Sequence, residues 1–321
     1  MTIQQNYING EWVDSSTGDT FETVNPAAPA EVVAEYQESG EKDAAAAVDA
    51  AADTKDLWGS TPAPERGAIL HTAGNILADK KDELTAQLTR EEGKTHAEAG
   101  GEVQRTIDIF HYYAQKARDL GGTVKSSSGR QTNLYTREEP VGVAALITPW
   151  NYPIAIPAWK IAPALAAGNT AAIKPATLVP GPVVAIVEAL DEAGIPDGVI
   201  NLVTGPGNTV GNELITHDRV DAVSFTGSSA VGEIVYDLTT EGGKRVQTEM
   251  GGKNPTIVTD SADIDAAAEI VANGVFGVTG QACTAGSRAL VYEDVYDEFV
   301  AAVVDRAEAI EVGPGDEYDM G

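Results

Sequence analysis

Cysteine is almost absent from this chain of 321 residues, with Cys283 as its single example. One cysteine cannot form a disulfide within the chain, so a disulfide-stapled fold is excluded and a reducing cytoplasm is the expected compartment. The start of the chain lacks a basic segment followed by an apolar one, so it does not resemble a secretory signal. The longest apolar stretch, residues 153–173, is interrupted by Lys160, prolines and Asn169, and we expect no membrane span.

Basic residues are also scarce. The chain has 49 Asp and Glu against 21 Lys and Arg, which gives a net charge of −28. The acidic residues are spread along the chain, and such a surface repels nucleic acid and anionic membranes, so neither is an expected partner. Because salt screens repulsion between like charges, we expect a halophilic protein from a high-salt cytoplasm. The histidines are not spaced as pairs of metal ligands, and no metal site is predicted: His71, His96, His111 and His217.

The rest of the composition is that of a globular protein. Hydrophobic residues make up 43% of the chain, and its length allows about two domains. Residues 7–13 read as a hairpin around Asn-Gly, and residues 43–57 as an alanine-rich helix. A long helical region begins at Pro64 and is closed by Gly121-Gly122, and the polar residues 125–142 read as an extended arm.

After the arm, short apolar runs alternate with helical segments. This alternation predicts a parallel sheet wound by helical crossovers. The predicted strands are 141–148, 170–174, 199–203, 222–225 and 245–249, and the predicted helices between them are 155–167, 181–193 and 209–216.

Cys283 stands in a segment of small residues, Gly280-Gln281-Ala282-Cys283-Thr284-Ala285-Gly286. Taken alone, it is either a buried thiol acting as a small hydrophobe or a nucleophile with room for a substrate. Other polar positions follow predicted strands, where parallel sheets bind ligands. The glycine-rich turns 205–211 and 227–232 serve either tight geometry or phosphate binding at a helix N-terminus.

The order of the motifs is more specific than any one of them. The chain reads Thr148-Pro149-Trp150-Asn151-Tyr152-Pro153, then Lys174-Pro175-Ala176, Phe225-Thr226-Gly227-Ser228, Glu249-Met250-Gly251-Gly252-Lys253-Asn254-Pro255 and Gly280-Gln281-Ala282-Cys283. This series resembles the NAD(P)-dependent aldehyde dehydrogenase superfamily along essentially the whole chain. The resemblance implies an α/β fold with a Rossmann-type dinucleotide-binding domain (1–121 and 142–249), an oligomerisation arm (122–141) and a partial α/β catalytic domain (250–321).

The resemblance also implies the catalytic roles. Cys283 would attack the aldehyde carbon and form a thiohemiacetal. Asn151 and the backbone N–H of Cys283 would donate to the developing oxyanion. Glu249 would act as the base that activates water to hydrolyse the thioester. In isolation, Asn151 would more often be a turn or cap residue and Glu249 a surface residue at a strand end, and only the joint pattern reverses that preference.

NADP or NAD is the implied cofactor. Strongly NAD-preferring members often carry Glu three residues after the lysine of the second motif, where this chain has Thr177, so NADP or dual use is expected. The implied cofactor-binding residues are Thr148, Pro149, Trp150, Lys174, Ala176, Thr177, Gly207, Gly211, Phe225, Thr226, Gly227, Ser228, Val231, Met250 and Gly251.

For the substrate, the motifs around Glu249 and Cys283 are similar to those of 2,5-dioxopentanoate (α-ketoglutaric semialdehyde) dehydrogenases of sugar-acid degradation. Succinate semialdehyde and betaine aldehyde dehydrogenases share most of them. Members of the family form homodimers or homotetramers and run well past the segment that residues 312–321 resemble. A C-terminal truncation is therefore expected, and a catalytically inactive dinucleotide-binding fragment is the alternative to an active enzyme.

Overall fold

A seven-stranded sheet forms the centre of the molecule in the computed structural model, which describes residues 3–315 and 317–321. The strand order is β12-β11-β8-β9-β10-β2-β3. The five strands from β12 to β10 are parallel, and β2 pairs antiparallel with both β10 and β3. The bounds are β8 Val143–Ile147, β9 Thr170–Lys174, β10 Ile200–Leu202, β11 Ala222–Thr226, β12 Arg245–Glu249, β2 Asn6–Ile8 and β3 Glu11–Val13.

These strands confirm the predicted parallel sheet. The chain runs from β8 outward to β9 and β10, then crosses back to β11 and β12 on the other side. This order of parallel strands is that of the Rossmann fold, and the switch in direction lies between β8 and β11. The carboxyl ends of these two strands are therefore where a ligand is expected.

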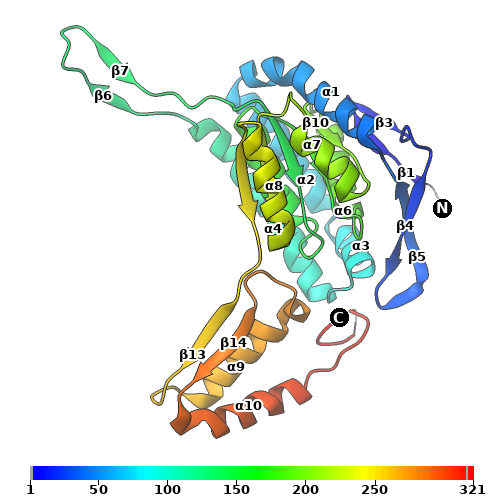
Figure 1. Cartoon of the computed structure of the whole chain (residues 1–321), viewed down its shortest axis with the longest axis vertical. Helices are drawn as coiled ribbons and strands as arrows, with labels where there is room; N and C mark the ends of the chain where they lie inside the picture. Colours follow the sequence, from blue (N-terminus) through cyan, green and yellow to red (C-terminus); the bar gives the residue numbers. More distant parts are fainter. Residues whose placement is uncertain (1–2, 316) are drawn as a thin grey trace.

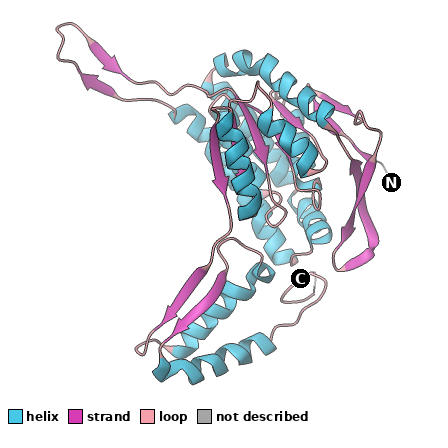
Figure 2. Ribbon diagram, viewed as in Figure 1, coloured by secondary structure: helices cyan, strands magenta, loops and turns pink. Residues whose placement is uncertain are grey.

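Helices cover both faces of the sheet (Figure 2). Within β8, Val143, Ala145 and Ile147 pack into one hydrophobic core, whereas Ala144 and Leu146 pack into the other. This alternation follows from the period of two of a strand, and burial of both faces explains why β8 reads as a continuous apolar run. On one face lie α1 Glu41–Ser60 and α7 Asn212–Thr216, with α8 Ser229–Glu241; on the other lie α2 Ala63–Asp79, α4 His96–Lys116, α5 Ala155–Ala166 and α6 Gly181–Glu192.

The long helical region predicted from Pro64 is three helices: α2, α3 Lys81–Glu92 and α4. Gly93 ends α3 with φ +96, a left-handed conformation that glycine adopts at low energetic cost. Thr95 then caps α4, accepting from the backbone N–H of Glu98 while the Glu98 carboxylate accepts from the N–H of Thr95. The turn between the two helices is therefore specified by its own residues.

Two hairpins lie outside the central sheet (Figure 1). The extended arm has the predicted place in the chain and ends in the hairpin of β6 Val124–Ser126 and β7 Asn133–Tyr135, where Val124 is 85% and Tyr135 73% exposed. The second hairpin, of β4 Thr20–Asn25 and β5 Ala28–Gln37, was not predicted from the sequence pattern, and β1 Ile3–Gln4 pairs with its strand β5. Both strands of that hairpin mix polar with small residues, so they lack a strong apolar signal.

The chain after β12 forms a smaller layer at the foot of the sheet (Figure 1). Two parallel strands, β13 Asn254–Val258 and β14 Gly286–Val291, pair with each other, and two helices pack together beside them, α9 Ile264–Phe276 and α10 Tyr296–Glu308. Val258, Ala268, Val271 and Phe299 form its small core. Of the residues described, none belongs to a helix that is both long and apolar enough to span a membrane.

Candidate active site

The three predicted catalytic residues come from three separate segments that meet below the sheet. Asn151 follows β8, Glu249 is the last residue of β12, and Cys283 lies between α9 and β14. Cys283 is exposed and is a free thiol. The alternative of a buried cysteine that only fills space is therefore wrong.

The backbone around Cys283 is held in an unusual conformation. Val278 and Thr279 have φ values of +51 and +52, a left-handed region that is strained for β-branched residues. On the other side of the thiol, the Asn254 amide donates to the carbonyl oxygens of Cys283 at 2.9 Å and Ala285 at 3.2 Å. Contacts from other elements therefore fix the path of the chain at the thiol.

The structure brings Asn151 to this segment. Its Nδ2 donates to the carbonyl oxygen of Gln281, two residues before Cys283, at 2.6 Å. An asparagine amide carries two N–H donors, and this hydrogen bond uses one of them. Asn151 is thus placed beside the cysteine segment with donor capacity for a substrate oxygen.

Glu249 is exposed at the end of β12, where its carbonyl accepts from the Gly227 N–H at 3.1 Å. The chain then turns toward the thiol, because a Cβ atom on Gly252 would lie 3.6 Å from the carbonyl oxygen of Cys283. Glu249 therefore lies on the segment that passes the cysteine.

A buried lysine, Lys160, lies near Glu249. Burial lowers the pKa of Lys160 to about 8, and the negative charge of Glu249 opposes that shift. The Lys160 ammonium donates to Ser224 Oγ at 2.7 Å, which donates to Gln247 Oε1 at 2.9 Å. Gln247 in turn makes a weak 3.4 Å hydrogen bond to Glu249 Oε1. Lys160 is thus connected to the predicted base through this chain of hydrogen bonds.

The predicted cofactor residues gather at the carboxyl ends of β8, β9 and β11. Ser228 caps α8, accepting from the Val231 N–H, and the helix start presents further backbone N–H groups at this edge. A Cβ atom on Gly227 would lie 2.5 Å from the buried Phe225 ring, so only glycine lets the backbone run here. Thr148 has a buried hydroxyl without a partner among the described residues. A phosphate-bearing nucleotide fits these features.

Lys174 is buried, with 5% of its surface exposed. Its ammonium donates to the carbonyl oxygens of Pro175 at 2.8 Å and Gly205 at 3.1 Å, and burial lowers its pKa to about 8. A Cβ atom on Gly211 would lie 3.8 Å from the Lys174 side chain. The remaining predicted cofactor residues are exposed or half-buried along the same edge: Pro149, Trp150, Ala176, Thr177, Gly207, Thr226, Val231, Met250 and Gly251.

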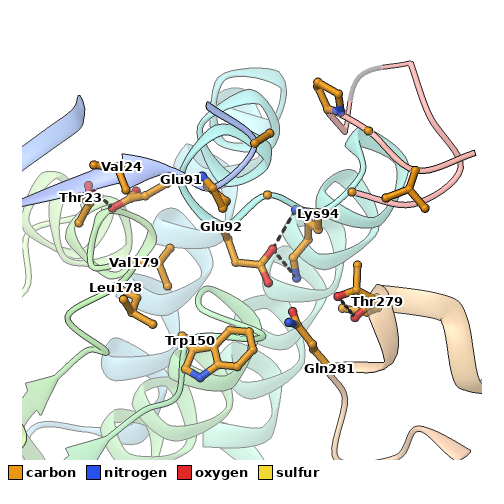
Figure 3. Close-up of a pocket in the computed structure, with 18 of the residues that line it drawn as sticks. Thr23, Val24, Glu91, Glu92, Lys94, Trp150, Leu178, Val179, Thr279 and Gln281 are labelled. Atoms are coloured by element: carbon orange, nitrogen blue, oxygen red, sulfur yellow. Dashed lines mark hydrogen bonds and ion pairs between the residues drawn. The ribbon is translucent and has the colours of Figure 1, made fainter. Parts of the chain in front are cut away.

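A cavity of about 790 Å³ adjoins the site (Figure 3). Trp150, Thr177 and Gln281 line it, together with Glu92 and Lys94 from the turn between α3 and α4. Asn151, Glu249 and Cys283 are not among its lining residues. The cavity therefore touches the carboxyl ends of β8 and β9 and the cysteine segment, but the thiol does not line it.

Several residues that hydrogen-bond to the segments carrying Asn151 and Cys283 could not be predicted from the motifs. Asn254 lies in the motif that begins at Glu249, and no role was predicted for it, although its amide donates to the Cys283 carbonyl oxygen. Lys94, Glu98 and Glu102 contact the loops that carry Asn151 and Cys283. Their spacing of four residues indicates one helix face, yet does not indicate what that face touches. No group of three His, Cys, Asp or Glu side chains in the described part of the chain is arranged to hold a metal ion.

Comparison with known proteins identifies close relatives. The model of the aldehyde dehydrogenase family matches residues 12–321. An alpha-ketoglutarate semialdehyde dehydrogenase of Haloferax volcanii is 68% identical over 317 residues, which are 99% of this chain and 66% of that protein. The crystal structure of betaine aldehyde dehydrogenase from Staphylococcus aureus in complex with NAD+ superimposes with a TM-score of 0.96 at 36% identity, covering 98% of this chain and 63% of that one. An NADP-dependent enzyme of E. coli superimposes with a TM-score of 0.94 at 35% identity, covering 98% and 65%. The chain thus spans about two thirds of the length of these proteins.

Proposed function

The chain belongs to the aldehyde dehydrogenase family, and we propose that it oxidises an aldehyde to a carboxylate with NAD(P) as hydride acceptor. The observation that carries the proposal is the meeting of three segments. Cys283 carries an exposed thiol, and the Asn151 amide is hydrogen-bonded to the segment that contains it. The chain after Glu249 passes the same segment at Gly252, and all three lie at one edge of a Rossmann-type sheet. These are the nucleophile, oxyanion donor and base that the reaction needs.

In the proposed mechanism, the Cys283 thiolate adds to the aldehyde carbon and the substrate oxygen takes up negative charge. The Asn151 amide and the Cys283 backbone N–H donate to that oxygen. A nicotinamide cofactor, when bound, would supply the acceptor for a hydride from the same carbon. Loss of that hydride leaves the carbon as a thioester of Cys283. Glu249 then removes a proton from a water molecule, which attacks the thioester and releases the carboxylate and the thiol.

The cofactor would lie along the ends of β8, β9 and β11. The α8 start, capped by Ser228, would hold the pyrophosphate, and Lys174 would face the adenosine ribose. Thr177 can donate a hydroxyl hydrogen bond to a ribose 2′-phosphate, whereas a carboxylate there would repel it. We therefore favour NADP or dual use over strict NAD use.

The proposed substrate is 2,5-dioxopentanoate, which is α-ketoglutarate semialdehyde. The 68% identity to the Haloferax volcanii protein of that name supports it. Succinate semialdehyde and betaine aldehyde are the alternative substrates. The exposed arm of β6 and β7 is the proposed contact to further copies in a homodimer or homotetramer, and we place the protein in the cytoplasm.

The test is a panel of these aldehydes crossed with NAD and NADP, followed by the absorbance of the reduced nicotinamide. The assay contains molar KCl, because screening should favour a chain with a net charge of −28. We expect the highest kcat/KM with 2,5-dioxopentanoate and no turnover by Cys283→Ala. Turnover that persists in Cys283→Ala would reject the mechanism.

One observation favours a second candidate function. The small layer after β12 leaves apolar side chains uncovered, with Ile257 64% and Leu290 51% exposed. A dinucleotide-binding chain that needs a partner polypeptide for catalysis would have this property. Saturable binding of NADPH without turnover of any aldehyde would support this function instead.

A further inference from the structure

Three charged side chains lie on one face at the start of α4. Lys94 precedes the helix, Glu98 lies in its first turn and Glu102 in its second, at intervals of four residues. Successive residues at this spacing stack on one face of a helix. Lys94 and Glu102 contact backbone groups of the loop that carries Asn151, and Glu98 contacts a backbone group of the segment that carries Cys283.

Glu98 connects the helix to the cysteine segment. Its Oε2 accepts from the Thr95 backbone N–H at 3.1 Å, which is the ordinary work of a capping residue. Its Oε1 accepts from the backbone N–H of Val278 at 2.7 Å. Val278 is one of the two β-branched residues held in the left-handed conformation just before Cys283. A strained conformation persists only where surrounding contacts enforce it, and the hydrogen bond from Glu98 is such a contact.

Glu102 and Lys94 connect the same helix to the asparagine loop. Glu102 Oε1 accepts from the backbone N–H groups of Ile154 and Ala155, both at 3.0 Å, at the start of α5. Its Oε2 pairs with the Lys94 ammonium at 2.5 Å, and both side chains are 2% exposed. Lys94 also donates to the carbonyl oxygen of Asn151 at 3.0 Å and lies 4.7 Å from the centroid of the Tyr152 ring.

We propose that Lys94, Glu98 and Glu102 are positioning residues that fix Asn151 and Cys283 relative to one another from a single rigid helix. The Lys94–Glu102 pair holds the loop with the oxyanion donor, and Glu98 holds the segment with the nucleophile. The catalytic consequence rests on the proposed function. A displacement of about 1 Å in a reacting group can lower a rate about 100-fold, so a shared anchor for both groups has a large effect on turnover.

The test starts from Glu98→Ala, with Glu83→Ala as the matched control because Glu83 is an exposed glutamate in the first turn of α3, at the end of that helix opposite to Gly93. Two readouts are taken. One is kcat and KM for the aldehyde, with the Kd for NADPH. The other is the rate at which iodoacetamide alkylates the protein, which reports only on Cys283 because the chain has no other cysteine. The alkylation rate does not depend on the chain being an active dehydrogenase.

For Glu98→Ala we expect kcat to fall at least about tenfold, with KM and the NADPH Kd within about threefold of the parent values. We expect the alkylation rate to change at least about threefold and Glu83→Ala to match the parent in every measurement. Glu98→Gln keeps one acceptor oxygen for the Val278 N–H and should recover most of the kcat.

Loss of the helix cap alone would lower the stability of the fold without changing the alkylation rate of Cys283, which lies in another segment. A folded Glu98→Ala with parental alkylation rate and kcat would therefore overturn the proposal. If Glu98→Ala fails to fold by circular dichroism, Glu98→Asp replaces it, because it keeps the charge but is one methylene too short to reach Val278. If the parent chain turns over no aldehyde, the proposed function fails, and the alkylation rates alone decide the positioning role.

Discussion

Replacing Glu102 with alanine tests how strongly the start of α4 is tied to the loop that carries Asn151. The substitution removes a carboxylate that accepts from the N–H groups of Ile154 and Ala155 and pairs with Lys94. It leaves the two N–H groups at the start of α5 without their acceptor and Lys94 without its nearest partner. Both ends of the pair are 2% exposed, so water reaches neither easily.

The expected loss of stability follows from these contacts. Each hydrogen bond to a charged group contributes about 1.5–3 kcal/mol, and removing one partner of a buried ion pair costs about 3–5 kcal/mol. These contributions are not additive, because they share one carboxylate. Glu92 remains 3.7 Å from the Lys94 ammonium and partly compensates its charge. We therefore expect Glu102→Ala to lower the free energy of unfolding by about 3 kcal/mol, near the lower end of the range.

The assay is urea unfolding followed by circular dichroism in molar KCl, with the slope m checked for constancy. Glu83→Ala is the matched control and should remain within about 0.5 kcal/mol of the parent, because Glu83 is exposed. The double substitution Lys94→Met with Glu102→Leu should recover only part of the loss. It removes the buried Lys94 charge that Glu102→Ala leaves without its nearest partner, but it also removes the cation 3.7 Å from Glu92. A loss below about 1 kcal/mol for Glu102→Ala would refute the reasoning, because it would mean that the pair and its two backbone contacts stabilise the fold very little.

Three further predictions concern the cofactor, the pH dependence and salt. Thr177→Glu should lower kcat/KM with NADP at least about tenfold relative to NAD, because the new carboxylate repels a 2′-phosphate; an unchanged ratio of the two cofactors would contradict the role of Thr177. Burial raises the pKa of Glu92 from 4.5 to about 7, so Glu92 contributes stability below pH 4.5 that is lost as the pH rises through 7. Between pH 4.5 and 7.5 the free energy of unfolding of Glu92→Gln, measured with urea, should therefore rise relative to that of the parent chain by about 3 kcal/mol, and parallel curves would reject the shift. The net charge of −28 predicts that the urea midpoint rises between about 0.1 M and about 2 M KCl, and a flat or falling midpoint would show that charge repulsion does not limit stability.

Much of the fold could be predicted from local patterns. The strands β8, β9 and β10 are short, largely apolar runs because both of their faces are buried. The predicted bounds of β9 and β12 match the structure. The hairpin of β4 and β5 was missed because its half-exposed strands carry polar and small residues. The helical region after Pro64 was predicted without its breaks, because the periodic pattern continues across the turns at Lys80 and Gly93.

The residues of the candidate site could likewise be predicted only in part. Cys283, Asn151 and Glu249 could be predicted because a family resemblance is carried by motifs that each lie within a few consecutive residues. Lys94, Glu98 and Glu102 could not, because their partners are backbone groups of residues such as Val278, which is 180 positions from Glu98 in the chain. A backbone N–H or carbonyl leaves no mark in the amino-acid sequence that would identify its partner.

The amino-acid sequence by itself determined which residues we propose as the reactive groups, the parallel α/β architecture and the acidic composition, because these depend on side-chain chemistry and local periodicity. It left open whether the single cysteine is buried or exposed, and the tertiary structure decided that Cys283 is exposed. The structure alone also decided that the thiol segment and the asparagine loop are anchored to the same helix. Exposure and anchoring both depend on which distant segments come together, and that is fixed by the packing of the whole chain.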